Sequence, residues 1–223
     1  MNRRKKDLNT IYISERMQEA LRNIARCPLT EVVAPMGYGK TTAVGWYLKD
    51  RAEVERAVII RISIYSDNKQ IFWKSTQKAF AEAGFPLLSE YEFPSELSES
   101  VMLAEDICSM LDIDRACYIF IDDFHLLNSR GVASFLCMIA KKLPGNVHII
   151  AAGRGRVLQN SDIVQLGRML HQISADSFRL NYTELSVYAG KCGIILSDEQ
   201  LDKLMHLSEG WFSAVYLQLR SME

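Results

Sequence analysis

The sequence predicts an α/β protein in which helices cover both faces of a parallel sheet, with a small helical subdomain after it. Three observations support this. Short apolar runs typical of buried strands alternate with segments in which apolar residues recur at helical spacing. A glycine-rich loop separates the first run from the helix that follows it. After about Arg154, the apolar runs give way to short helical patterns.

Four apolar runs are expected to be strands, and a fifth candidate is weaker. The four are Thr30–Ala34, Ala57–Ile64, Tyr118–Asp122 and Val147–Ala152, and the weaker one is Phe178–Asn181. Short buried strands that alternate with helices form parallel βα units, with helices on both faces of the sheet.

Helices are expected wherever apolar residues share one face. In the first part of the chain, such sets begin at Phe72, Leu97 and Val132, and a lead-in helix is expected over Leu8 to Arg26. Further along, we expect Thr183 to cap one helix. Ser197-Asp198-Glu199-Gln200 opens a second with a capping-box pattern, and Phe212 begins the apolar face of a last one.

These patterns divide the chain into four expected segments, with the boundary of the core between 154 and 182. They are a tail with the lead-in helix (1–27), an α/β core (28–160), a connecting segment (161–182) and a helical subdomain (183–223). The chain stops at Glu223, in or just after the last helix. We interpret it as the truncated start of a longer protein.

Composition excludes several classes of protein. The chain has 26 Lys+Arg against 27 Asp+Glu, and this near-neutral balance argues against a nucleic-acid-binding surface. The longest stretch without a charged side chain, Leu143 to Gly153, is far shorter than the roughly 20 apolar residues of a membrane span. The basic start, Met1 to Asp7, is expected to be a solvated tail. Five scattered cysteines without metal-ligand spacing favour a reducing cytoplasm.

The strongest motif is Ala34-Pro35-Met36-Gly37-Tyr38-Gly39-Lys40-Thr41-Thr42, which fits the phosphate-binding loop pattern A-x-x-x-x-G-K-T. Gly37 and Gly39 permit backbone conformations closed to residues with a Cβ, and the loop amides can then point at phosphate oxygens. Lys40 would bring positive charge to the β and γ phosphates as a binding and catalytic residue, and Thr41 would ligate Mg²⁺. A plain glycine-rich turn is the alternative, but a strand precedes this loop and a helix follows it.

A second motif is the apolar run that ends in Asp122 and Asp123. The carboxyl end of a parallel strand lies at the sheet edge where α/β proteins bind ligands. Asp122 would hold Mg²⁺, and Asp123 would be the catalytic base that orients and deprotonates the attacking water. A solvated strand end is the alternative, and the phosphate loop favours the functional interpretation. His125 either touches this site or is a satisfied surface histidine.

A third motif places Arg154 at the end of another apolar run. A guanidinium there would bind the γ-phosphate bidentately and distinguish ATP from ADP. A surface ion pair is the alternative, and Arg156 competes for the role. Gly210-Trp211, at the start of the last helix, either closes over the nucleotide base or is a plain helix start with a packed aromatic.

These motifs in this order resemble the nucleotide-binding module of STAND-class signalling ATPases, in particular the large LuxR-type transcriptional regulators of the MalT kind. The likeness runs from about Ile11 to Leu219. The segments that carry it are Leu29–Thr42, Ile119–His125, Gly153-Arg154, Phe178–Leu185 and Ser208–Leu217.

The resemblance implies a three-layer P-loop NTPase fold of the ASCE type, with the strand before Arg154 lying between the phosphate-loop strand and the Asp-Asp strand. It also implies ATP or ADP with Mg²⁺ as cofactors and self-association of the full-length protein. DNA would be bound only through a C-terminal helix-turn-helix that this chain lacks. Two departures are Phe212, where many relatives carry proline near the adenine, and Gly153, where a polar residue is common.

The function expected from these features is an ATP/ADP-binding switch that hydrolyses ATP slowly. One alternative is a P-loop phosphotransferase such as a small-molecule kinase. It would need an arginine-rich lid, for which Arg156, Arg168 and Arg179 are available. The other is a module that binds nucleotide and assembles without cleaving it.

Overall fold

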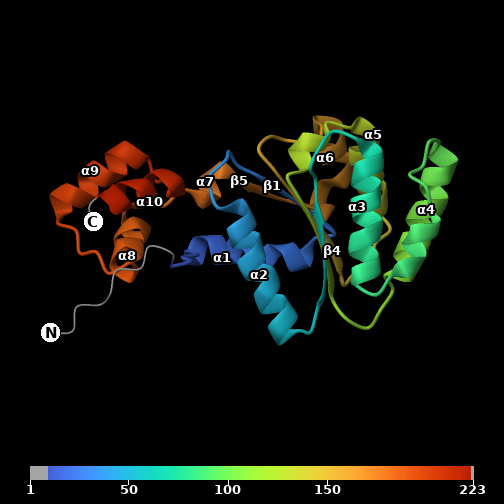
Figure 1. The fold of residues 1–223 in the computed structure, drawn as a ribbon, viewed down its shortest axis with the longest axis horizontal. Helices are drawn as coiled ribbons and strands as arrows, with labels where there is room; N and C mark the ends of the chain where they lie inside the picture. The colour runs from blue at the N-terminus through green and yellow to red at the C-terminus, as the bar shows by residue number, and fades with distance from the viewer. Residues whose placement is uncertain (1–9, 222–223) are drawn as a thin grey trace.

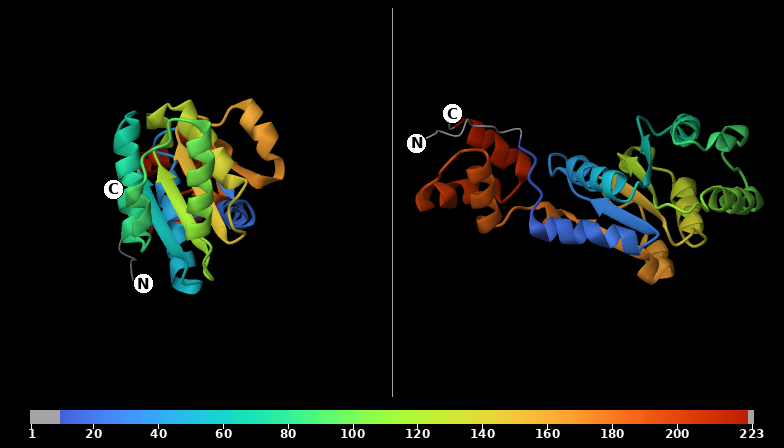
Figure 2. Two further views of the ribbon diagram at one scale, coloured as in Figure 1. Left: turned by 90° about the vertical axis from the view of Figure 1, so that its right-hand side faces the viewer. Right: turned by 90° about the horizontal axis from the view of Figure 1, so that it is seen from below.

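The structure is a computed structural model that describes residues 10–221. Figure 1 shows an α/β core at one end and a group of helices near the C-terminus at the other. The second panel of Figure 2 shows helix α1 (Glu15–Arg22) running along the core, with one end at the helical group. The basic tail expected over Met1 to Asp7 lies outside the described residues.

Within residues 10–221, five strands form one parallel sheet in the order β2-β3-β4-β1-β5. The strands are β1 (Leu29–Val33), β2 (Val58–Ser63), β3 (Cys117–Asp122), β4 (Val147–Gly153) and β5 (Leu170–Ser174). Strand β4 lies between β1 and β3, which is the order that the resemblance implies. All five strands point the same way, so their carboxyl ends share one edge of the sheet.

Helices cover both faces of this sheet, which makes three layers. The core helices are α1, α2 (Lys40–Val54), α3 (Lys69–Glu82), α4 (Leu97–Met110), α5 (Arg130–Ala140) and α6 (Asn160–Leu166), with short 3₁₀ turns at Asn23–Arg26, Pro86–Glu90, Phe124–Leu127 and Gly167–Met169. Side chains alternate along β3. Tyr118 and Phe120 pack with α1 and α2, whereas Ile119 and Ile121 pack with α3, α4 and α5. The predicted α/β fold is confirmed.

The lead-in helix is shorter than expected. Ser14 caps α1 by accepting a hydrogen bond from the backbone N–H of Met17, and residues 10–14 before it are not helical. Tyr12 in this segment instead stacks on Tyr188, at 5.8 Å between ring centroids. The N-terminal segment therefore reaches from the core to the C-terminal helices.

The fifth strand was placed wrongly. Phe178–Asn181 is not a strand: Phe178 ends the short helix α7 (Ala175–Phe178), and the strand is β5, which pairs with β1. Along β5, Ile173 is the residue that is fully buried, because the strand lies at the sheet edge. It therefore lacks the apolar run that marks a buried strand. The range expected to be a connecting segment, 161–182, thus contains a strand of the core sheet.

The helical subdomain consists of α8 (Tyr182–Lys191), α9 (Asp198–Ser208) and α10 (Phe212–Ser221). Its buried side chains form a cluster separate from those of the core, centred on Leu185, Tyr188 and Leu204. The capping box at Ser197 is confirmed, because Ser197 and Gln200 exchange hydrogen bonds. The cap of α8 is Asn181 rather than Thr183, since its carboxamide oxygen accepts from the N–H of Glu184.

Candidate functional site

The glycine-rich loop connects the carboxyl end of β1 to the first turn of α2. Gly37 and Gly39 both adopt left-handed backbone conformations, with φ of +79° and +81°. Gly39 caps the helix, and its carbonyl accepts the first helical hydrogen bond, from the N–H of Ala43 at 2.8 Å. The amides of Lys40, Thr41 and Thr42 consequently have no partner within the helix. A helix N-terminus of this kind is a site for anions.

The side chain of Lys40 is almost fully buried and folds back over the loop. Its ammonium donates to the carbonyl oxygens of Ala34 (2.7 Å) and Pro35 (3.0 Å). Burial lowers the pKa of Lys40, and the charge of Arg154 lowers it further, whereas Asp123 and Asp122 oppose the shift. Two of the sequence-predicted carboxylates and the predicted arginine therefore lie within electrostatic reach of this ammonium.

Thr41 and Asp122, the two predicted magnesium ligands, meet across the gap between α2 and β3. The hydroxyl of Thr41 donates to Oδ2 of Asp122 at 2.9 Å. A hydroxyl and a carboxylate are oxygen donors of the kind that Mg²⁺ prefers, with phosphate oxygens and waters completing its octahedron. The pair therefore fits Mg²⁺ bound together with a phosphate. Among residues 10–221, no group of three or more His, Cys, Asp or Glu side chains is arranged to hold a metal ion.

Asp123 turns the chain at the end of β3. Its backbone is left-handed, with φ of 55°, a conformation that aspartate tolerates better than most residues. About half of its side chain is exposed, and Oδ1 lies 3.8 Å from Nδ1 of His125. Burial lowers the pKa of His125, and Nδ1 has no hydrogen-bond partner within the described chain. His125 is therefore beside the site and is not a satisfied surface histidine.

Arg154 follows β4 and is exposed to solvent. The chain before it comes close to the 3₁₀ turn after β3, because a Cβ on Gly153 would lie 3.4 Å from the backbone nitrogen of His125; it would also lie 3.3 Å from the carbonyl oxygen of Gly155. This contact explains a glycine at 153. The charge of Arg154 acts on Lys40 and His125. Arg156 lines a hollow beside β5 that also includes Ala34 and Pro35 of the loop. The assignment of Arg154 to the γ-phosphate stays a prediction.

Glu31, on β1, is a residue of the site region to which we assigned no role from the sequence. Only 2% of it is exposed, and Oε1 accepts hydrogen bonds from the backbone N–H groups of Val157 (2.9 Å) and Leu158 (3.2 Å). Oε2 accepts from Gln172 at 2.8 Å. The carboxylate therefore ties the turn after Arg154 to β1 and β5. Its signal in the sequence was a charged residue inside an apolar run.

A cavity of about 400 Å³ opens beside the loop, between the core and the helical subdomain. This is the size of a typical small-molecule site. The residues that line it are Thr10, Ile11, Tyr12, Ile13, Ser14, Met17, Gly37, Tyr38, Gly39, Thr42, Ala43, Ser177, Phe178, Leu180, Phe212, Ser213 and Tyr216. The segment 10–14 was not expected to contribute. Phe212, one of the two departures from the family pattern, lies on the wall.

The first turn of α10 touches the loop. The indole of Trp211 stacks on the ring of Tyr38, at 6.2 Å between centroids and 27° between planes. Ser213 donates from its backbone N–H and its hydroxyl to the carbonyl oxygen of Gly37. Gly210 has φ of +73°, and a Cβ there would lie 2.1 Å from the carbonyl oxygen of Leu180. Trp211 thus packs on the loop. Position 210 requires glycine because its φ is positive and the backbone of Leu180 lies close to it.

The order of the sheet, the loop between β1 and α2, and the acidic pair at the end of β3 define a P-loop NTPase fold. No family model matches the chain. It is similar, however, to the HTH-type transcriptional regulator MalT of Vibrio campbellii, with 20% identity over 94% of this chain and 24% of that protein. MalT of Yersinia enterocolitica is 24% identical over the same shares of the two chains. The predicted resemblance to MalT-type regulators is confirmed. The chain spans about a quarter of these relatives.

Solved structures show the same fold. A STAND protein with a tetratricopeptide repeat sensor from Pyrococcus horikoshii matches 96% of this chain and 33% of its own, with a TM-score of 0.61 and 13% identity. Cdc6p from Pyrobaculum aerophilum matches 94% of this chain and 60% of its own, with a TM-score of 0.57 and 16% identity.

No helix among residues 10–221 is long and apolar enough to cross a bilayer.

Proposed function

We propose that the chain is an ATP/ADP-binding signalling switch with slow, Mg²⁺-dependent ATP hydrolysis. It would form the N-terminal regulatory module of a LuxR-type transcriptional regulator in the cytoplasm. The observation that carries the proposal is the convergence of Lys40, Thr41, Asp122 and Asp123 at the carboxyl edge of the sheet, beside the cavity. The similarity to MalT regulators along 94% of the chain supports the regulatory role.

The phosphate chain would lie along the loop from Ala34 to Thr42. Lys40 now donates to carbonyl oxygens of that loop. Phosphate oxygens are better acceptors for an ammonium than neutral carbonyls, because they carry negative charge and attract the ammonium by Coulomb interaction. Lys40 would therefore turn toward the β and γ phosphates and stabilise the charge that develops during cleavage.

Thr41 and Asp122 would hold Mg²⁺, because their oxygens already lie together. The ion, when bound, would neutralise phosphate charge and polarise the γ-phosphoryl group. The carboxylate of Asp123, which is about half exposed, would orient a water and accept its proton. Arg154 would bind the γ-phosphate and report its loss.

The base end of the nucleotide would occupy the cavity. Tyr12, Phe178, Phe212 and Tyr216 provide aromatic surface for a planar ring system. The helical subdomain contributes two of these residues and also touches the loop through Ser213. Exchange of ATP for ADP would therefore change the position of the subdomain relative to the core. A full switch between two such positions requires about 5.5 kcal/mol of differential binding.

Two of the expected partners depend on segments outside this chain. Self-association and DNA binding would belong to the full-length regulator. This chain spans 24% of the length of its MalT relative from Vibrio campbellii. The kinase alternative gains no support, since the region expected to form an arginine-rich lid contains α6 and β5, which belong to the core.

The test is a titration of the purified chain with fluorescent ATP and ADP analogues, with and without Mg²⁺, followed by measurement of phosphate release. We expect tight binding, and turnover well below the roughly 1–100 s⁻¹ of phosphotransfer enzymes. Lys40→Met should lose binding. Asp123→Asn should bind ATP and fail to cleave it.

Four results would contradict the proposal in different ways. Absence of binding removes the nucleotide site, and normal hydrolysis by Asp123→Asn removes the assigned base. Turnover that depends on an added acceptor molecule would favour the phosphotransferase. Binding without any cleavage would favour the assembly module.

A further inference from the structure

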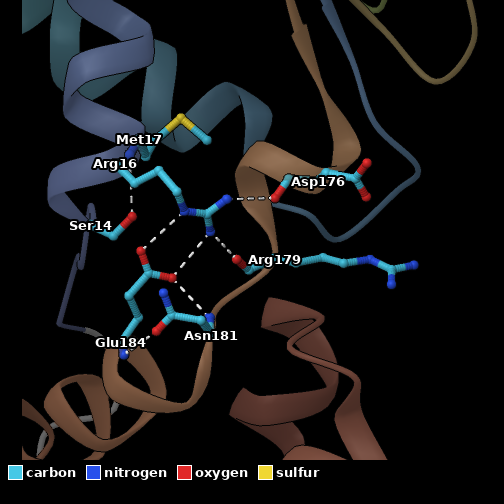
Figure 3. Close-up of polar contacts among 7 residues, drawn as sticks. All are labelled: Ser14, Arg16, Met17, Asp176, Arg179, Asn181 and Glu184. Atoms are coloured by element: carbon cyan, nitrogen blue, oxygen red, sulfur yellow. Dashed lines mark hydrogen bonds and ion pairs between the residues drawn. The ribbon is translucent and has the colours of Figure 1, made fainter.

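The guanidinium of Arg16 joins the core to the helical subdomain (Figure 3). Arg16 lies in the first turn of α1, and its side chain reaches the chain that leads from β5 into α8. Nη1 donates to the carbonyl oxygen of Asp176 at 2.8 Å, and Nη2 donates to that of Arg179. Nη2 and Nε also donate to the carboxylate of Glu184, at 3.1 and 3.4 Å.

These partners lie on both sides of the connection between core and subdomain. Asp176 belongs to α7, directly after the core strand β5, whereas Glu184 is in the first turn of α8. Glu184 also accepts a hydrogen bond from the N–H of Asn181, as part of the capping box that starts α8. One side chain of α1 is therefore bonded both to α7, next to the core sheet, and to the first turn of α8.

The Glu184 carboxylate is held firmly by these contacts. Only 11% of its side chain is exposed. Burial raises its pKa, but hydrogen bonds from Arg16 and Asn181 lower it by more, and the net pKa lies below its ordinary value. The carboxylate of Glu184 thus belongs both to the capping box of α8 and to the ion pair with Arg16.

Arg16 lies beside the cavity without lining it. Ser14 and Met17, its neighbours in the sequence, form part of one wall, and Ser177, Phe178 and Leu180 form part of another. The contacts of Arg16 with Asp176, Arg179 and Glu184 bracket the second wall. The contacts of Arg16 therefore connect the two walls, although Arg16 itself is not a lining residue.

We propose that Arg16 is a positioning residue for the base end of the nucleotide site, which holds the subdomain over the cavity and thereby limits the rate at which nucleotide leaves. This inference rests on the proposed function. The hydrogen bonds of Arg16 go to Asp176, Arg179 and Glu184, none of which belongs to the phosphate loop. Loss of Arg16 should therefore weaken the hold on the base and leave phosphate binding intact.

If Arg16 only stabilised the fold, its loss would weaken the binding of the base and of the phosphates equally. The chain also offers a matched control for the loss of a positive charge from α1. Arg22 lies on the same helix, and its ion pair with Glu19 is local and exposed. Such surface pairs contribute little. Arg22→Met removes the same charge from α1 without touching the connection to the subdomain.

The experiment measures dissociation of a fluorescent ADP analogue, chased with excess ADP, and the affinity for inorganic tripolyphosphate with Mg²⁺. For Arg16→Met we expect dissociation about tenfold faster or more, since hydrogen bonds to charged groups are the strong ones. Tripolyphosphate affinity should not change. Arg16→Lys should be intermediate, because an ammonium can pair with Glu184 but lacks the planar fork. Arg22→Met should match the wild type.

An unchanged dissociation rate in Arg16→Met would overturn the proposal, and so would an equal loss of affinity for both probes, which indicates general destabilisation. If Arg16→Met does not fold, Arg16→Lys and Glu184→Gln decide in the same way. If the wild type binds neither probe, the proposed function fails. If it binds both and the Arg16 variants behave as wild type, only this inference fails.

Discussion

Ser213 donates two hydrogen bonds to a single acceptor, the carbonyl oxygen of Gly37. The backbone N–H lies at 3.2 Å and the hydroxyl at 2.8 Å. The acceptor belongs to the phosphate loop and the donors to the first turn of α10. The helical subdomain is thus joined to the backbone of the loop itself, in addition to facing it across the cavity.

This contact predicts that Gly37→Ala is more harmful than Gly39→Ala. Both glycines are left-handed, which costs an alanine about 1–2 kcal/mol. A Cβ on Gly37 would also lie 2.5 Å from Oγ of Ser213, whereas at Gly39 nothing in the described chain lies within 4 Å. Urea unfolding of the nucleotide-free protein should show the larger loss for Gly37→Ala. Equal losses would mean that Ser213 moves aside without cost.

The parts of the site that the sequence predicted are those whose signal is local. The loop motif is contiguous, and the strands that precede Asp122 and Arg154 are buried along almost their whole length, so they stand out as apolar runs. Parallel strands then bring their carboxyl ends to one edge. The adjacency of Thr41 and Asp122 follows from this rule without knowledge of any long-range contact.

The parts that were missed depend on residues far apart in the sequence. Tyr12 packs on Tyr188, and Arg16 bonds to Glu184, yet nothing near either tyrosine or either charged residue marks the pairing. Strand β5 was missed because an edge position buries few of its side chains. The walls of the cavity and the position of the subdomain therefore required the structure.

Glu31→Gln should destabilise the protein by about 2–3 kcal/mol, because a buried group left without its partner costs roughly 1–3 kcal/mol. The Glu31 carboxylate accepts three hydrogen bonds from Val157, Leu158 and Gln172. A glutamine amide would turn an NH₂ donor toward at least one of these donors. Chemical unfolding measures the loss.

Glu82→Gln is the control for this substitution. Glu82 pairs with Lys78 on the exposed surface of α3, with 69% of its side chain in solvent. We expect almost no change in the free energy of unfolding for that variant. A similarly small effect for Glu31→Gln would mean that the new amide keeps its oxygen toward Val157 and Leu158, and that the amide of Gln172 turns to accept from its NH₂ group.

Lys40→Met should separate binding from stability. Lys40 is almost fully buried, and burial lowers its pKa, so the charged form is held in the fold at a cost. A methionine of similar length removes this cost together with the bonds to Ala34 and Pro35. A hydrogen bond contributes only about 1 kcal/mol net, and the desolvation cost that methionine removes offsets the loss of these two bonds. We expect the free energy of unfolding of the nucleotide-free variant to lie within about 1 kcal/mol of the wild-type value. A large loss would identify Lys40 as a structural anchor of the loop.

His148 should make the stability of the core depend on pH. It lies on β4 with 5% of its surface exposed, its Nδ1 is 3.0 Å from the carbonyl oxygen of Cys27, and its ring packs on Tyr118. Burial lowers its pKa, although the bond to Cys27 and the charge of Glu55 oppose the shift. The neutral ring is therefore the form that the fold accommodates.

The sign of the effect follows from the pKa of the unfolded chain, near 6.5. As the pH falls below that value, the unfolded state takes up a proton that folded His148 does not, so the free energy of unfolding decreases. For one proton the slope is at most about 1.4 kcal/mol per pH unit, until the pH reaches the folded pKa. Unfolding measured on both sides of pH 6.5 should show this decrease in the wild type and a smaller one in His148→Gln.

The exposed His206 provides the control, because His206→Gln should keep the wild-type slope. Equal slopes in all three proteins would mean that His148 accepts its proton inside the folded core.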